Sequence, residues 1–269
     1  MIFFKRNSII ELALEEDIGT GDITTEAIIP KHETTTAVIS AKASGIIAGL
    51  NVVKEIYKKA HILFHVKDSD KVKAGQAIVE IQGNTRYLLS RERVALNFLG
   101  HLSGIATEAS KYVTAVKNKV TILDTRKTTP GLRKLEKYAV RMGGAQNHRI
   151  GLYDMVLIKD NHIKAAGSIT KAVTLARKHC IKKIEVEIEQ LDQLQEAIEA
   201  KPDMIMLDNM STSDMKKAVR IVNKKIPIEA SGGVTLKNVA AIAKTGVDYI
   251  SVGAITHSSK TLDVTMEFK

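Results

Sequence analysis

Two adjacent cations, Arg126 and Lys127, follow a short apolar run and precede the turn Pro130-Gly131. The run, residues 120–123, has the composition of a β-strand, and in α/β folds ligands bind at the carboxyl ends of strands. Arginine offers a planar fork to a carboxylate or phosphate, and lysine offers a point charge. We therefore expect a small polyanionic substrate here. A solvated basic helix start is the alternative, and it is disfavoured because cations near a helix amino terminus need an anion beside them.

Five further apolar runs end on polar or glycine residues. The six predicted strands are 120–125, 155–160, 183–189, 204–209, 227–233 and 249–254. Amphipathic helical patterns lie between most of them, at 168–179, 191–200, 213–223 and 236–245. This alternation predicts an α/β fold with parallel strands and crossover helices. About six strands in one direction favour a (β/α) barrel that is short of eight strands, and an open doubly wound sheet is the alternative.

A barrel would gather the strand ends around one cavity with two halves. The positive half would consist of Arg126, Lys127, His148, Arg149 and Lys159. The negative half, Glu187 and Asp208, suits Mg²⁺, held directly or through water, together with a polyol. Late glycines would let backbone N–H groups approach phosphate oxygens, in the stretches Ser231-Gly232-Gly233 and Gly253-Ala254. The pattern indicates a substrate with carboxylates, a second with phosphate and hydroxyls, and a divalent metal.

Three glutamates, Glu185, Glu187 and Glu189, share one face of the third predicted strand. Three like charges in a row cannot all point into a closed barrel while they are ionised. We expect Glu187 to be the inward ligand and Glu189 to lie near the rim. The alternative is that all three face a boundary between a helix and solvent.

The first hundred residues follow a different pattern. A helix is predicted at 8–16, short strands and turns from 34 to 82, and then a helix at 86–117 that bridges to the second region. Residues 66–81 resemble the β half of biotinyl or lipoyl carrier domains. A carrier role is disfavoured because no acceptor lysine hairpin is visible.

The chain length of 269 residues fits one barrel plus a small partner domain. We predict an N-terminal α/β domain at residues 1–105 and a catalytic barrel domain at residues 106–269. The last residues of the barrel domain are expected to pack back on the first domain.

The net charge of +10 favours anionic partners, but the pattern differs from that of nucleic-acid binders. Aromatic residues are only 4%, tryptophan is absent, and most lysines fall on the polar faces of helical patterns. We expect anionic small molecules and no nucleic acid. A nucleic-acid binder, the alternative, would bind DNA in a salt-dependent way.

Targeting signals are not visible in the sequence. The run Ile2-Phe3-Phe4 before Lys5-Arg6 is too short, and in the wrong order, for a secretory signal. No apolar run reaches about 18 residues, so no membrane helix is predicted. The single cysteine, Cys180, fits a reducing cytosol, and a cytoplasmic location is the expectation.

Ten phrases along the chain stand in the order found in one known family. They are residues 16–24, 92–97, 101–107, 124–133, 147–152, 157–162, 185–187, 207–209, 229–233 and 252–257. On these phrases the chain resembles the quinolinate phosphoribosyltransferases, also called carboxylating nicotinate-nucleotide pyrophosphorylases. One departure is Gly143-Gly144-Ala145, where the family commonly has three glycines. The phrase Lys159-Asp160-Asn161-His162 differs from that of a sister group tied to molybdenum gene clusters, which is one rival assignment.

The resemblance implies phosphoribosyl transfer from 5-phosphoribosyl-1-pyrophosphate to quinolinate with decarboxylation, in de novo NAD biosynthesis. It implies Mg²⁺, a small α/β domain before an incomplete barrel, and a homodimer or higher oligomer with shared active sites. The implied dicarboxylate contacts are Arg93 from the partner, Arg126, His148, Arg149 and Lys159. The implied phosphoribosyl and metal contacts are Thr125, Lys127, Glu187, Asp208, Ser231, Gly232, Gly233, Val252, Gly253 and Ala254. Catalytic roles are expected for Lys127, Lys159, Glu187 and Asp208, with Glu187 and Asp208 at the metal. A barrel enzyme acting on another sugar phosphate is the second rival, and it would not need Arg126, Arg149 and Lys159.

Overall fold

The computed structural model describes residues 8–117 and 119–269. The run Ile2-Phe3-Phe4-Lys5-Arg6 lies outside the described residues. The chain divides into two compact units: residues 1–108, 129–144 and 259–269 form unit 1, and residues 109–128 and 145–258 form unit 2. The predicted cut between residues 105 and 106 falls inside helix α5 (Glu92–Val116). Segment 129–144, which the prediction gave to the barrel, clusters with unit 1.

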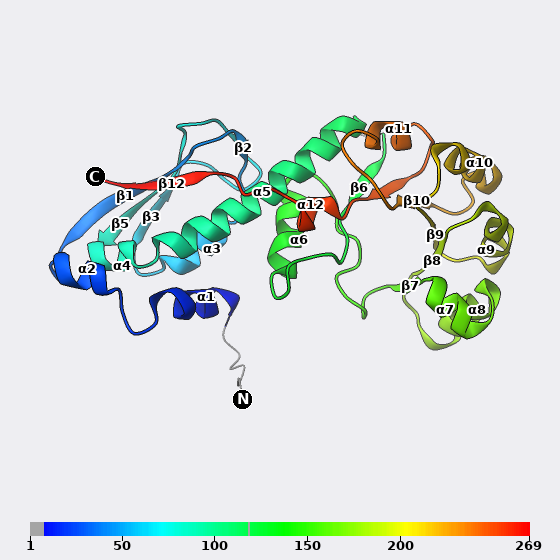
Figure 1. The fold of residues 1–269 in the computed structure, drawn as a ribbon, viewed down its shortest axis with the longest axis horizontal. Coiled ribbons are helices and arrows are strands. Elements are labelled where there is room, and N and C mark those ends of the chain that lie inside the picture. The colour runs from blue at the N-terminus through cyan, green and yellow to red at the C-terminus, as the bar shows by residue number, and fades with distance from the viewer. Residues whose placement is uncertain (1–7, 118) are drawn as a thin grey trace. The chain divides into compact units, whose positions relative to one another are not determined.

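Unit 2 is built on a six-stranded parallel sheet, seen in Figure 1 with its outer helices. Its strands are β6 (Thr121–Leu123), β7 (Val156–Ile158), β8 (Ile184–Ile188), β9 (Met204–Asp208), β10 (Ile228–Ser231) and β11 (Tyr249–Ser251). The order across the sheet is β6-β11-β10-β9-β8-β7, and among the described residues β6 and β7 do not pair with each other. An incomplete barrel is the result, as predicted. All five residues of β8 are buried, because one face lies under helices and the other faces the barrel interior.

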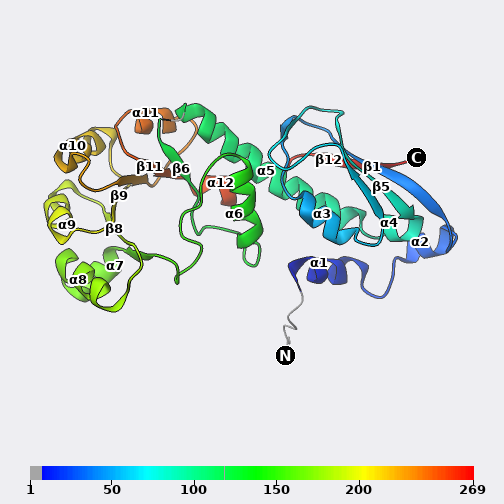
Figure 2. The ribbon, with the colours of Figure 1, turned by 180° about the vertical axis from the view of Figure 1, so that it is seen from behind.

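The helices of unit 2 follow the strands and cover the outside of the sheet. They are α7 (Asp160–Ala166), α8 (Ile169–His179), η1 (Leu191–Gln193), α9 (Leu194–Ala200), α10 (Thr212–Val222), α11 (Val239–Ala243) and α12 (Ala254–His257). Figure 2 shows α8, α9 and α10 side by side along one side of the strands. The predicted helix 236–245 is shorter in the structure, and α7 was missed. Helix α7 starts directly after Lys159, whose backbone N–H donates to Nδ1 of His162 at 3.0 Å.

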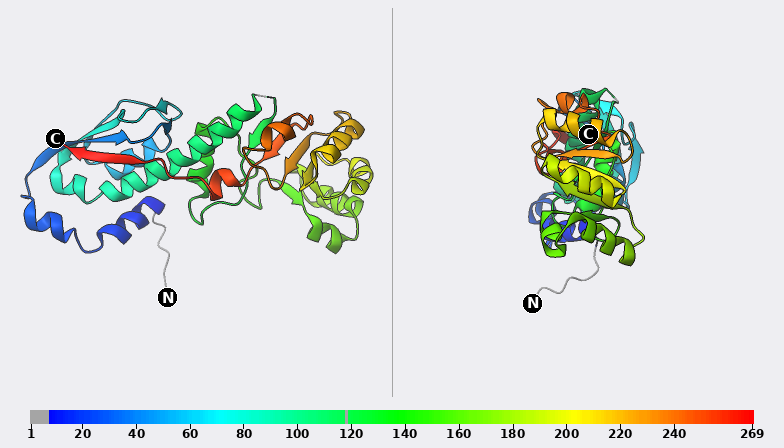
Figure 3. Two further views of the ribbon diagram at one scale, coloured as in Figure 1. Left: turned by 45° about the horizontal axis from the view of Figure 1, so that its top comes forward. Right: turned by 90° about the vertical axis from the view of Figure 1, so that its right-hand side faces the viewer.

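Unit 1 holds an antiparallel sheet of order β12-β1-β5-β3. Its elements are α1 (Ile9–Ile18), α2 (Ile23–Ile28), β1 (Thr34–Ala41), β2 (Gly45–Ile46), α3 (Leu50–Ile56), β3 (His61–Phe64), β4 (Lys71–Val72), β5 (Ala77–Asn84), α4 (Thr85–Leu89), α6 (Arg133–Met142) and β12 (Val264–Phe268). The C-terminal strand β12 pairs antiparallel with β1, so the last residues do pack against the N-terminal sheet. Figure 3 shows this red strand beside the blue β1.

Two helix predictions in unit 1 have clear outcomes. Helix α1 is confirmed, because Ser8 caps it by accepting from the Glu11 N–H while the Glu11 side chain accepts from the Ser8 N–H. The prediction of only strands and turns from 34 to 82 is wrong at α3. There Leu50, Val52, Val53 and Ile56 are all buried. Their spacing forms one apolar helical stripe, which a reading for strands overlooked.

No helix among the described residues is both long enough and apolar enough to cross a membrane.

Candidate active site

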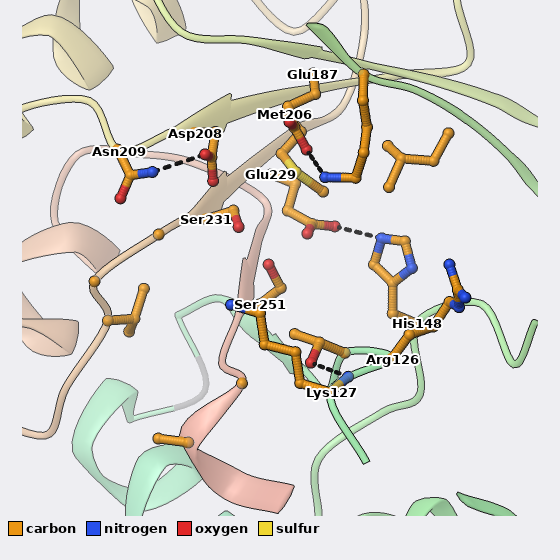
Figure 4. A pocket seen from close by; sticks show the side chains of 18 of the residues that line it. Arg126, Lys127, His148, Glu187, Met206, Asp208, Asn209, Glu229, Ser231 and Ser251 are labelled. Carbon is orange, nitrogen blue, oxygen red and sulfur yellow. Dashed lines mark hydrogen bonds and ion pairs between the residues drawn. The ribbon is translucent and has the colours of Figure 1, made fainter. Parts of the chain in front are cut away.

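A cavity of about 610 Å³ opens where the strands of unit 2 end. Its lining is shared by every strand end of the sheet, and Figure 4 shows the main side chains around it. The lining residues are Thr125, Arg126, Lys127, His148, Arg149, Leu157, Lys159, Glu187, Met206, Asp208, Asn209, Glu229, Ser231, Gly232, Gly233, Val234, Thr235, Ser251, Gly253, Ala254 and His257. Every predicted site residue of the barrel is therefore at this cavity, with one exception.

The exception is Val252, which is fully buried and does not line the cavity. Its N–H donates to the carbonyl of Leu123 at 2.9 Å, so it is used in joining β11 to β6. Arg93 is also absent from the lining. It lies in unit 1 on α5, with an exposed side chain.

Arg126 and Arg149 bring two half-buried guanidinium groups to one side of the cavity. The Nε of Arg126 is buried and has no hydrogen-bond partner among the described residues. Burial, followed by the positive charge of Arg126, lowers the pKa of Arg149 below its ordinary value. Two neighbouring, half-buried cations lower stability when no anion is beside them, because a buried polar group costs free energy when it is left unpaired. A ligand with more than one carboxylate would complete it.

Lys127 is held through its backbone, which leaves its side chain exposed. Its N–H donates to the hydroxyl of Thr125 at 3.0 Å, and its carbonyl accepts from the Thr256 hydroxyl at 2.8 Å. A Cβ at Gly253 would lie 3.2 Å from the Lys127 Cδ. The absence of a side chain at Gly253 therefore leaves the lysine stem free to lie across this turn.

Lys159 and Glu187 form an ion pair on the opposite side, with 2.5 Å between Nζ and Oε2. Glu187 is almost fully buried, whereas about half of the Lys159 side chain is exposed, at 46%. The ion pair links the predicted positive and negative halves of the site. The remaining acceptor sites of the Glu187 carboxylate can take a second partner, such as a ribose hydroxyl or a metal.

Asp208 ends β9 beside Ser231 of β10, with which it is in register. Its Oδ2 accepts from the Asn209 amide at 2.7 Å. Gly232 follows with φ +88°, and a Cβ there would lie 2.2 Å from the Asn209 side-chain oxygen. Only glycine fits this turn, and the turn keeps backbone close to the cavity. The hard oxygen donors of Asp208 and Glu187 fit Mg²⁺, which is commonly held by one or two carboxylates plus substrate phosphates.

His148 lies between two glutamates that the sequence analysis did not place in the site. Its Nε2 is 3.0 Å from Oε2 of Glu185 on β8 and 3.4 Å from Oε2 of Glu229 on β10. Both glutamates are fully buried. Burial raises the pKa of Glu185 to about 7. Burial alone would lower the pKa of His148, but the hydrogen bonds and charges of the two carboxylates outweigh it and raise that pKa to about 10.

The expectation for the three glutamates of β8 is therefore only partly right. Glu187 lines the cavity, and Glu189 is exposed. Glu185 points inward as well, because an imidazole stands beside it. Alternation along β8 could have found Glu185, and the apolar neighbours of Glu229 could have marked it as buried. Nothing local in the sequence shows that the two meet at His148.

Two family models cover most of the chain. The model described as quinolinate phosphoribosyl transferase, N-terminal domain, matches residues 22–103, and the C-terminal domain model matches residues 105–267. Among curated proteins, the chain is 47% identical over 260 residues to the probable nicotinate-nucleotide pyrophosphorylase [carboxylating] of Bacillus subtilis, with 94% of this chain and 89% of that protein covered. It is 41% identical over 270 residues to the Mycobacterium leprae nicotinate-nucleotide pyrophosphorylase [carboxylating], with 96% and 95% covered.

Solved structures agree with these sequence matches. The nicotinate-nucleotide pyrophosphorylase from Francisella tularensis superimposes with a TM-score of 0.94 at 44% identity, covering 97% of this chain and 95% of that one. NadC from Streptococcus pyogenes gives a TM-score of 0.92 at 41% identity with the same coverage. A Pyrococcus furiosus nicotinate-nucleotide pyrophosphorylase at 17% identity shares the fold, with a TM-score of 0.80.

Proposed function

The chain belongs to the quinolinate phosphoribosyltransferase family, and we propose how its cavity performs the family's reaction. The enzyme transfers the phosphoribosyl group of 5-phosphoribosyl-1-pyrophosphate to the ring nitrogen of quinolinate. Pyrophosphate leaves from C1 of the ribose, and the carboxylate next to the ring nitrogen leaves as CO₂. The product is nicotinate mononucleotide, a precursor in de novo NAD biosynthesis.

Arg126 and Arg149 bind the two carboxylates of quinolinate in this proposal. Arg126 carries the observation that supports the assignment most strongly, a buried Nε without a partner. Two guanidinium groups bound to two carboxylates fix the orientation of the quinolinate ring and hold its nitrogen toward C1 of the ribose. Such positioning lowers the activation barrier by several kcal/mol. For fully oriented reactants the reduction is roughly 7–11 kcal/mol.

Lys127 and the turns at Gly232-Gly233 and Gly253-Ala254 bind the phosphates of the donor. Glu187 and Asp208 bind the ribose hydroxyls and place negative charge near the oxocarbenium-like sugar as pyrophosphate departs. Mg²⁺, held by Asp208 and Glu187 directly or through water, would supply positive charge to the departing pyrophosphate. Lys159 shares Glu187 with these groups through its ion pair.

Decarboxylation follows from the charge on the ring. Once the nitrogen carries the ribose it is positive, and its charge stabilises the electron pair that stays on the adjacent carbon when CO₂ leaves. That carbon then takes up a proton. Lys159, which lines the cavity, is the proposed donor.

Arg93 is proposed to act in the cavity of a second copy within a homodimer. Its exposed side chain on α5 is free to reach a partner. Mixing Arg93→Ala with Lys127→Ala tests this, because each hybrid dimer would contain one intact site. Random mixing makes half of the dimers hybrid, so about a quarter of the wild-type activity should return. No recovery on mixing two inactive variants would place Arg93 in its own chain's site, and an active Arg93→Ala would place it outside the reaction. We also propose a cytoplasmic location, which agrees with the free thiol of Cys180.

The first experiment is a pyrophosphate-release assay with quinolinate present, omitted, or replaced by nicotinate. Release should depend on quinolinate. A site built to pair charged groups rejects an analogue that lacks one of them by about 10⁴-fold, so nicotinate should be a very poor substrate. Similar turnover of the two acids would contradict the assignment of Arg126 and Arg149.

A further inference from the structure

Two buried carboxylates, one lining the cavity and one behind it at His148, have no role in the proposed reaction. Glu185 on β8 and Glu229 on β10 are fully buried, and both contact Nε2 of His148. Figure 4 shows the Glu229 carboxylate turned toward the imidazole. In the sheet order, β8 and β10 are separated by β9, so the two glutamates come from alternate strands. Alternate strands supply the inward side chains of one layer in barrels of this kind.

These carboxylates are expensive to bury, and their own contacts do not offset the cost. Oε1 of Glu185 and Oε1 of Glu229 lack a hydrogen-bond partner in the described part of the chain, and Oε2 of Glu229 has only the long ion pair with His148. Barrel interiors are normally filled by valine, isoleucine and leucine. Replacing a buried ionic cluster by apolar residues is often neutral or stabilising. Stability therefore does not explain why two acids face one histidine here.

The other side of the imidazole leads to the dicarboxylate half of the site. Nδ1 of His148 accepts the backbone N–H of Arg149 at 2.7 Å. The Arg149 guanidinium then donates to the carbonyl of Met155 at 3.2 Å. From the other end, buried Asp124 accepts the His148 N–H at 2.9 Å. The backbone from which Arg149 extends is thus held on both sides of its peptide bond to His148.

Both ring nitrogens of His148 have protein partners, Nε2 at the glutamates and Nδ1 at Arg149. The expectation from the sequence was that His148 contacts the dicarboxylate itself. His148 lines the cavity, so that contact stays a prediction, and the geometry also makes the ring a connection between the barrel interior and Arg149.

We propose that Glu229, together with Glu185, is a positioning residue for quinolinate: the two carboxylates hold the imidazole of His148, and the imidazole fixes the backbone of Arg149. This inference rests on the proposed function, since it assigns a role within the same site. The charge of Glu185 also acts favourably on the Arg149 guanidinium, whose ionisation burial and Arg126 oppose. The buried pair therefore prepares the orientation of Arg149 for its ligand, and Glu185 also favours its charge.

Glu229→Gln is the decisive variant, because it keeps the side-chain shape and removes the charge. The amide can donate to Glu185, which relieves two adjacent acids, so the thermal midpoint should be unchanged or raised. The KM for quinolinate should nevertheless rise roughly tenfold or more, since a small displacement of a binding group has large effects. The KM for 5-phosphoribosyl-1-pyrophosphate should stay within about twofold. A merely structural Glu229 would instead lower stability and affect both substrates alike, and that outcome would overturn the proposal.

Glu136→Gln is the matched control. Glu136 is also fully buried and also contacts a histidine, with His101 Nε2 at 2.8 Å, but it lies in unit 1 and outside the cavity. Its substitution should leave the quinolinate KM within about twofold. An equal rise in both variants would show that the effect of Glu229→Gln is nonspecific.

Two further measurements separate the alternatives. If wild-type enzyme fails to release pyrophosphate with quinolinate, the proposed function itself fails, whatever Glu229→Gln does. The three groups could also hold a cation, because their ligand atoms lie within 4.8 Å of one another. Elemental analysis of the purified wild type, after dialysis against a chelator, should find no bound transition metal. One equivalent of metal that is lost in Glu229→Gln would replace the positioning role by a metal site.

Discussion

Each unit of the molecule buries glutamate against histidine, and the two cases differ in the number of donors. In unit 1, Glu136 receives His101 at 2.8 Å and the Thr129 N–H at 3.1 Å, one for each oxygen. Burial alone would raise the pKa of Glu136, but these hydrogen bonds outweigh it and leave that pKa below its ordinary value. In unit 2, Glu185 and Glu229 share one imidazole, and burial raises the pKa of Glu185 to about 7.

The difference teaches how to tell a structural carboxylate from a functional one. A buried acid whose oxygens are each satisfied contributes to the fold and needs no ligand. A buried pair with too few donors is a liability for stability, and groups of this kind cluster at functional sites. The unit 2 cluster also lines the cavity through Glu229 and His148, whereas Glu136 does not line it.

The largest expected effect comes from removing the histidine of each cluster. His148→Ala would leave Glu185 and Glu229 buried together without a cation, a situation that costs about 3–5 kcal/mol. His101→Ala would leave Glu136 with the Thr129 N–H and should cost only about 1–3 kcal/mol. Urea denaturation of both variants measures the difference. Equal losses would mean that the number of carboxylates around the histidine does not matter.

Removing a guanidinium at the cavity tests the functional side of the contrast. Arg126→Ala should weaken quinolinate binding by about 2–4 kcal/mol while the fold stays intact, because a carboxylate would lose its charged partner. Calorimetric titration with quinolinate gives the change directly. Glu136→Gln, titrated in parallel, should bind as the wild type does. Unchanged affinity in Arg126→Ala would remove this residue from the dicarboxylate role.

The contrast between the units also separates what the sequence could reveal from what it could not. Arg126, Lys127 and Asp208 follow apolar runs, and a parallel sheet brings such strand ends together, so their meeting was predictable. Arg149, which the sequence analysis places in the positive half, stands far from any predicted strand end and also lines the cavity. Helix α3 was missed because its apolar stripe was read as part of a strand pattern.

The buried cluster was beyond sequence reasoning for a physical reason. From the repulsion between like charges, we place Glu187 inside the barrel and make no prediction for Glu185. That prediction is incomplete because it considers only the charges of one strand. His148, from a loop 37 residues earlier in the chain, changes the balance for Glu185, and that contact depends on the tertiary structure.

The smallest expected effect is a pair of opposite pH dependences of stability. Glu136 has a lowered pKa, so its contribution is present above the ordinary value of about 4.5 and is lost as the pH falls through the lower folded value. His148 has a pKa raised from 6.5 to about 10, so its contribution is complete below 6.5 and is lost as the pH rises through about 10. The pKa of Glu185 is raised from 4.5 to about 7, so stability is also lost as the pH rises from 4.5 to 7.

Glu136→Gln should therefore flatten the acid limb of the stability profile, and Glu185→Gln should flatten the limb between pH 4.5 and 7. Urea midpoints from pH 3 to pH 10 for the wild type and both variants would give the two limbs separately. Because unit 1 contains the acid-sensitive contact and unit 2 the alkali-sensitive one, amide hydrogen exchange at the two extremes should show different units opening first. If the same unit opened first at both extremes, these clusters would not control the pH limits of the fold.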